Sequence, residues 1–169
     1  MFEKINISRI VRDHVSTLRD YHTKRYRPSD FFLFFGFPAV VAAIVLYFCG
    51  VLGSSLITIV ATSLSIFAAL LFNLLLLTYD AIRKTNDTGS SDTLRRDFLR
   101  ELFSNISFAI FVAIIAIVLV LVLVLLDKAT VAQNVFSFFI YYLVSVFVLT
   151  LLMVLKRMHV LLAKEFDTD

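Results

Sequence analysis

Four long apolar runs, separated by short polar segments, dominate the pattern of hydrophobic and polar positions along the chain. They cover residues 31–52, 54–79, 105–126 and 132–155. Each run has the roughly 20 residues that a helix needs to cross a bilayer, because a helix rises about 1.5 Å per residue. The runs are apolar on every side, and none contains Asp, Glu, Lys, Arg or His. This pattern predicts an all-α membrane protein, a bundle of four transmembrane helices.

The polar segments divide the chain into five parts. Residues 1–30 carry apolar positions at helical spacing, which predicts a cytoplasmic amphipathic helix, and residues 31–79 form a first transmembrane hairpin. Residues 80–104 predict a cytoplasmic loop followed by a helix that runs on into the third apolar run. Residues 105–155 form a second hairpin, and residues 156–169 form a cytoplasmic tail that extends the fourth helix.

The placement of Lys and Arg predicts which side of the membrane each segment occupies. Of the 16 basic residues, seven precede the first run, five lie between the second and third runs, and three follow the fourth. Only Lys128 lies in either of the other two connections. Because basic segments stay in the cytoplasm, both termini are expected there, around a multi-pass chain in the cell (inner) membrane. The first run is expected to act as an uncleaved anchor, since a largely polar segment of 30 residues precedes it.

Composition narrows the chemistry that the chain can perform. It is 60% hydrophobic, with one cysteine, three histidines and four glycines. A single cysteine excludes a disulfide within the chain, and no histidine stands at ligand spacing from a carboxylate or thiol. We therefore expect no metal, no cofactor and no enzymatic activity. The lack of any ionisable residue in the runs also argues against ion-coupled transport, which usually depends on one.

An alternative to a non-enzymatic chain is a catalytic site in the N-terminal segment. Arg9 and His14 have the Arg-x4-His spacing that resembles the active motif of HEPN ribonucleases. In those proteins a polar residue commonly follows the arginine, whereas here it is Ile10.

Small and polar residues recur at helical spacing inside the membrane runs. Such residues let helices approach closely, and Asn or Ser forms hydrogen bonds across the contact. Alternatively, the same side chains would line a water-filled pore in an oligomer. The candidate packing or pore-lining residues are Thr62, Ser65, Ala69 and Asn73 in the second run, and Asn105 and Ala109 in the third. Pro38 is predicted to kink the first run, because proline removes a backbone hydrogen bond.

The basic residues beside the membrane runs are candidate contacts for anionic lipids of the inner leaflet or for a cytoplasmic protein partner. Acidic residues are interleaved with them, so no nucleic-acid partner is expected. The candidates are Arg12, Arg19, Arg25 and Arg27 before the first run, and Arg95, Arg96 and Arg100 before the third.

The overall plan combines a short amphipathic N-terminal helix, two hairpins, little extracellular mass and a charged central helix. In this plan the chain resembles small bacterial membrane proteins of anti-phage defence systems, such as the membrane subunit of Kiwa. The resemblance implies a homo-oligomeric membrane component that senses or signals membrane disturbance together with a cytoplasmic partner. With this resemblance, we expect a non-enzymatic sensor, scaffold or membrane-perturbing effector of a bacterial defence or stress system. The alternative is a homo-oligomeric pore or channel lined by Ser, Thr and Asn residues.

Overall fold

The computed structural model describes residues 11–12, 32–87, 93–126 and 130–166. Within these ranges the chain is helical apart from short connections, and it contains no strand. The elements are η1 (Phe32–Gly36), α3 (Phe37–Cys49), α4 (Ser54–Asp87), α5 (Thr93–Leu125) and α6 (Thr130–Phe166). The all-helical prediction is therefore confirmed for the part of the chain that the structure describes.

Three of these helices are long enough and apolar enough to cross a membrane. α4, α5 and α6 have 34, 33 and 37 residues, or about 50 Å each at 1.5 Å per residue. That length exceeds the roughly 30 Å of a hydrocarbon core, so each helix extends beyond it. One helix runs from Thr93 through Leu125, as the sequence pattern indicates for the central helix and the third run.

The first apolar run forms a shorter helix than its sequence indicates. Its apolar stretch, Phe34–Cys49, is shorter than those of the three long helices. Pro38 lies in the first turn of α3, directly after the π-helical turn η1. A proline cannot donate the helical hydrogen bond, and a wider turn is one way in which a helix accommodates it. The helix ends at Cys49, and it is followed by Gly50, whose φ of 71° is a conformation that residues with a Cβ rarely adopt.

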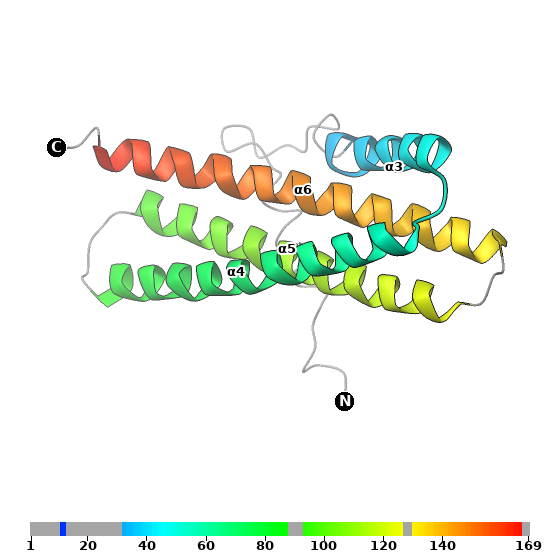
Figure 1. The fold of residues 1–169 in the computed structure, drawn as a ribbon. Coiled ribbons are helices and arrows are strands. Elements are labelled where there is room, and N and C mark those ends of the chain that lie inside the picture. The colour runs from blue at the N-terminus through cyan, green and yellow to red at the C-terminus, as the bar shows by residue number, and fades with distance from the viewer. Residues whose placement is uncertain (1–10, 13–31, 88–92, 127–129, 167–169) are drawn as a thin grey trace.

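The helices pack in the order α3, α6, α5, α4 (Figure 1). No pair of Cα atoms within 8 Å links α3 to α4, so these two outer helices do not close the arrangement into a ring. The connection between them is held to α6 instead. Leu52 donates its backbone N–H to Ser137 Oγ at 3.2 Å, and the Tyr141 hydroxyl donates to Gly50 O at 3.4 Å.

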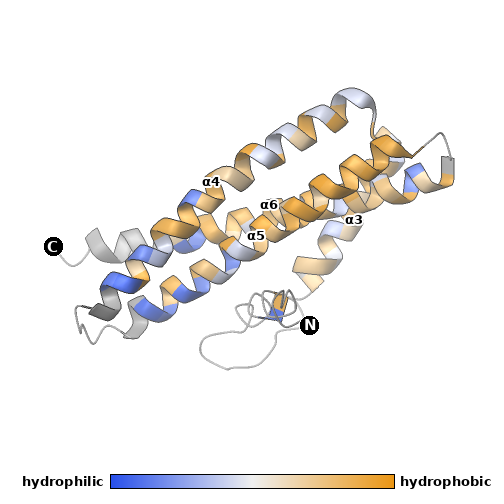
Figure 2. Ribbon diagram, turned by 90° about the horizontal axis from the view of Figure 1, so that it is seen from below, coloured by the Kyte–Doolittle hydropathy of each residue, from blue (hydrophilic) through white to orange (hydrophobic). Residues whose placement is uncertain are grey.

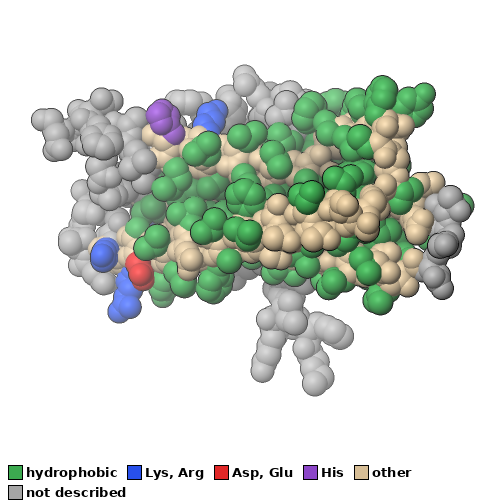
Figure 3. Space-filling model, viewed as in Figure 1, with side chains coloured by type: hydrophobic (Ala, Val, Ile, Leu, Met, Phe, Trp, Pro, Cys, Tyr) green, Lys and Arg blue, Asp and Glu red, His purple; other side chains and the backbone are tan. Residues whose placement is uncertain are grey.

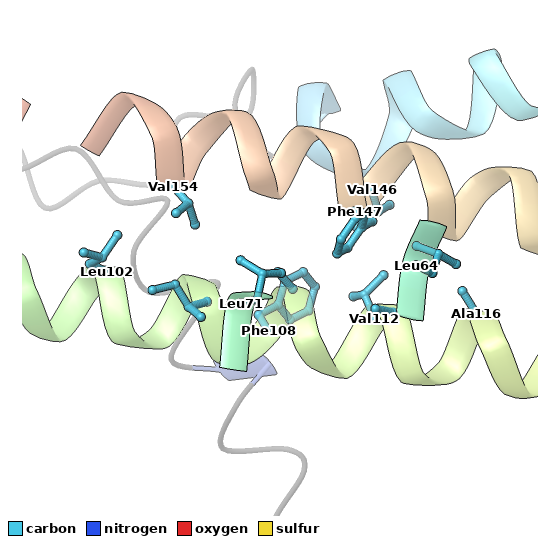
Figure 4. Packing of buried hydrophobic residues seen from close by; sticks show 12 residues of the cluster. Leu64, Leu71, Leu102, Phe108, Val112, Ala116, Val146, Phe147 and Val154 are labelled. Atoms are coloured by element: carbon cyan, nitrogen blue, oxygen red, sulfur yellow. The ribbon is translucent and has the colours of Figure 1, made fainter. Parts of the chain in front are cut away.

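The core lies around α5 and the helices that flank it. Figure 4 shows side chains of α4, α5 and α6 pointing toward one another, among them Leu64, Phe108 and Phe147. The rings of Phe67 and Phe147 lie 6.1 Å apart, so α4 and α6 also touch through side chains. On α5 the successive alanines at 109, 113 and 116 are fully buried. These small side chains allow the neighbouring helices to come close.

Candidate functional site

Charged side chains gather at one end of the three long helices. Figure 2 shows hydrophilic residues concentrated where α4 ends, α5 begins and α6 ends, and Figure 3 shows an apolar surface along most of the length. The connection between α3 and α4, the end of α5 and the start of α6 lie at the other end. The charged residues of α4, α5 and α6 with described side chains are Asp80, Arg83, Lys84, Arg96, Asp97, Arg100, Glu101, Lys156 and Arg157, and the exposed His159 lies beside them. We call this part of the molecule the charged end, and we call the other the uncharged end because its described residues include no Asp, Glu, Lys or Arg.

An ion pair joins α5 to α6 at the charged end. Arg157 Nη1 donates a hydrogen bond to Glu101 Oε2. The Arg157 side chain is only 14% exposed, whereas Glu101 is 35% exposed. A guanidinium that has lost most of its water needs a hydrogen-bonded anion nearby. The pair therefore fixes how these two helices meet, and the sequence pattern assigned Arg157 no role beyond setting topology.

Three buried hydroxyl groups of the helices have hydrogen-bond partners within the subunit, whereas the buried Ser104 Oγ has none among the described residues. Thr78 Oγ1 donates to Leu74 O and Thr150 Oγ1 donates to Val146 O, both at 2.8 Å. Ser137 is fully buried and accepts the bond from Leu52 described above. These hydrogen bonds give the three hydroxyl groups a structural role in the packing of the helices.

The structure separates the six candidate packing or pore-lining residues into two groups. Asn105 and Ala109 are fully buried inside the helix array. The α4 candidates, by contrast, are exposed on the side of that helix that faces away from its buried residues Leu64 and Leu71. This exposed group consists of Thr62, Ser65, Ala69 and Asn73. The two groups therefore do not form a common lining within one subunit.

Two hydroxyl groups on the outward side of α4 form hydrogen bonds with carbonyl groups of their own helix. Ser65 Oγ donates to Ala61 O at 2.8 Å, and Thr58 Oγ1 donates to Ser54 O at 3.2 Å. Such bonds to the preceding turn hide a hydroxyl within its helix. A carboxamide cannot be hidden in this way as completely, because it carries two donors and an acceptor. Before the charged residues that begin at Asp80, Asn73 is thus the most polar group that this side of α4 presents.

The basic candidates are described only in part. Arg96 and Arg100 are exposed at the charged end, and Arg12 is exposed while its neighbour Val11 packs against the main core cluster. Arg95 lies in α5. Arg19, Arg25 and Arg27 lie outside the described residues, as do Arg9 and His14.

Among the described residues, no three His, Cys, Asp or Glu side chains lie close enough together to hold a metal ion. A shallow hollow at the uncharged end is lined by Leu119, Val135, Phe136 and Phe139, which carry no polar side-chain atom. No family model matches the chain, and no curated protein or solved structure matches it either.

Proposed function

We propose that this chain is a non-enzymatic, homo-oligomeric component of a bacterial inner membrane, acting as a sensor, scaffold or membrane-perturbing effector in a defence or stress system. The observation that carries the proposal is the collection of charged side chains at one end of α4, α5 and α6. Under the positive-inside rule this end faces the cytoplasm. It then offers anionic lipids and a cytoplasmic protein partner a surface of helix ends that project beyond the hydrocarbon.

In this proposal α3 is a fourth crossing, which places both termini in the cytoplasm. Residues from Phe32 to Cys49 are continuously helical, and 18 residues rise about 27 Å. That is close to the roughly 30 Å of a hydrocarbon core. The connection from α3 to α4 lies at the uncharged end, as a crossing from the cytoplasm requires.

The defence role rests on the resemblance in overall plan to small membrane proteins of anti-phage systems. It is tested by comparing the plating of a panel of phages on bacteria with and without the full chain, expressed with its neighbouring genes. We expect reduced plating, and we expect reversal of both Arg96 and Arg100 to Glu to abolish the reduction. The double change of these residues to Lys keeps the charge and serves as the matched control.

Two results together count against the proposal. One is a purified chain that is monomeric, and the other is full activity after deletion of residues 1–24. Equal plating with and without the chain, across the whole panel, removes the defence role.

A pore is the second candidate function, and the outward side of α4 favours it. Thr62, Ser65 and Asn73 face away from the subunit, so a ring of subunits with α4 innermost would have a polar lining. Conductance measured across liposomes that contain the oligomer tests this candidate. Absence of conductance in every oligomeric state excludes it.

A further inference from the structure

The outward side of α4 carries a line of small and polar residues among large apolar ones. Its exposed positions include Thr62, Ser65, Ala69 and Asn73, whereas the side turned toward α5 and α6 carries Leu64, Leu71 and other apolar residues. We call these four residues the α4 stripe. In water such a helix would be ordinary, because its polar side would be hydrated. In a membrane the stripe would meet acyl chains, which form no hydrogen bonds.

Asn73 is the residue of the α4 stripe that is least suited to contact with acyl chains. It lies seven residues before Asp80, the first charged residue along α4, which is about 10 Å along the helix axis. Apolar side chains surround it on the same surface, with Leu70, Phe72 and Leu77 respectively 58%, 53% and 66% exposed. The carboxamide is therefore held at the depth of hydrocarbon, on a surface of the subunit that no other described helix covers.

We infer that the α4 stripe is a dry contact with the α4 stripe of a second copy of this chain. This inference rests on the proposed oligomeric function and names the surface that forms the oligomer. Copies inserted by the same rule share one orientation, so a twofold axis along the membrane normal brings each residue near its own counterpart. A carboxamide is both donor and acceptor, and Asn73 therefore satisfies Asn73 of the other copy.

Two further features of the same surface suit a second copy. Ala69 and Ser65 lie one and two turns from Asn73, and their small side chains allow two helix backbones to approach closely. At the charged end, Asp80 and Arg83 are both exposed and lie within one turn of each other. In a parallel pair of α4 helices, Asp80 of one copy lies at nearly the same depth as Arg83 of the other. The contact is thus complementary in hydrogen bonding, in shape and in charge.

Cysteine cross-linking in membrane vesicles tests the inference. The single native cysteine is removed by Cys49→Ala, and one cysteine is introduced at Ser65 or Ala69. Control cysteines replace Leu70 on a neighbouring side of α4 and Val148 on α6, both of which are exposed. We expect rapid disulfide-linked dimers from Ser65→Cys and Ala69→Cys and little product from the two controls. Dimers that form preferentially at Val148→Cys overturn the inference.

Substitution of Asn73 provides a measurement that does not depend on cross-linking. Interhelical hydrogen bonds in membranes contribute enough that Asn73→Leu should weaken self-association by about 3- to 30-fold. Asn73→Gln keeps a carboxamide and should retain most of the association. Mass measurement over a range of detergent-to-protein ratios gives both values. Equal association of wild type and Asn73→Leu overturns the inference.

The outcomes separate this inference from the function on which it rests. An oligomer that cross-links elsewhere removes the α4 contact and leaves the oligomeric function standing. A chain that is monomeric in the membrane removes both. Fast reaction of Ser65→Cys with a water-soluble maleimide shows that water reaches the stripe, which overturns the dry contact in favour of a pore.

Discussion

Enlarging Ala109 tests whether close helix approach around α5 stabilises the subunit. Ala109 is fully buried, and so are Asn105, Ala113 and Ala116 along the same side of α5. A leucine at 109 adds three carbon atoms where there is no exposed surface to receive them. The neighbouring helices then have to separate or the new side chain has to leave its preferred rotamers.

Overpacking of this kind costs about 1–3 kcal/mol. Because the adjoining positions on α5 are also closed, we expect Ala109→Leu to cost about 2 kcal/mol, roughly a 30-fold change in the unfolding equilibrium. The chain has no Trp but has 18 Phe and 6 Tyr, so unfolding in detergent can be followed by near-ultraviolet circular dichroism during titration with SDS.

The same substitution at exposed alanines is the matched control. Ala43 on α3 and Ala69 on α4 are both exposed, so a leucine there meets open space within the subunit. We expect changes below about 0.5 kcal/mol at both positions, as for most surface substitutions, under conditions that keep the chain monomeric. Equal destabilisation at 109 and 43 would refute the reasoning.

Two further predictions concern contacts between segments. Glu101→Gln removes the carboxylate that accepts the hydrogen bond of the largely buried Arg157 and should cost roughly 1–2 kcal/mol, between the values for exposed and buried pairs. Asp97→Asn, one turn earlier and exposed, should cost almost nothing in the same SDS titration, and equal losses would contradict the role of the pair. Ser137→Ala removes the acceptor for the Leu52 N–H and should cost about 1–2 kcal/mol. Ser145→Ala is the control, because that hydroxyl bonds only within its own helix, and the difference between the two changes should appear in the unfolding midpoint.

The helices themselves could be predicted because length and uniform apolarity dominate the sequence. No other structure satisfies the backbone groups of so long an apolar run in lipid. The continuation of α6 beyond the fourth run was expected from the sequence. The continuation of α4 to Asp87 was not, because residues 80–87 were assigned to a cytoplasmic loop. For α3 the presence of Pro38 indicated a local distortion, but not that the distortion would be the π-helical turn η1.

Which side of each helix packs against the other helices could not be predicted from the sequence. A helix that is apolar on every side carries no signal for which side packs inward. Ala69 and Ala109 are the same residue type in similar surroundings along the chain, yet one is exposed and the other fully buried. The Glu101–Arg157 ion pair could not be predicted from the sequence either, because it depends on how α5 and α6 meet and not on any spacing within one helix.

The side of the membrane on which the charged end lies is the central claim of this account. In a Cys49→Ala background, single cysteines at Ser54 and at Arg96 would mark the uncharged and charged ends, since both positions are exposed. A membrane-impermeant maleimide is applied to intact spheroplasts and then again after permeabilisation. The account predicts that Ser54→Cys reacts in intact spheroplasts and that Arg96→Cys reacts only once they are permeabilised. Labelling of Arg96→Cys from outside, with Ser54→Cys protected, would contradict it.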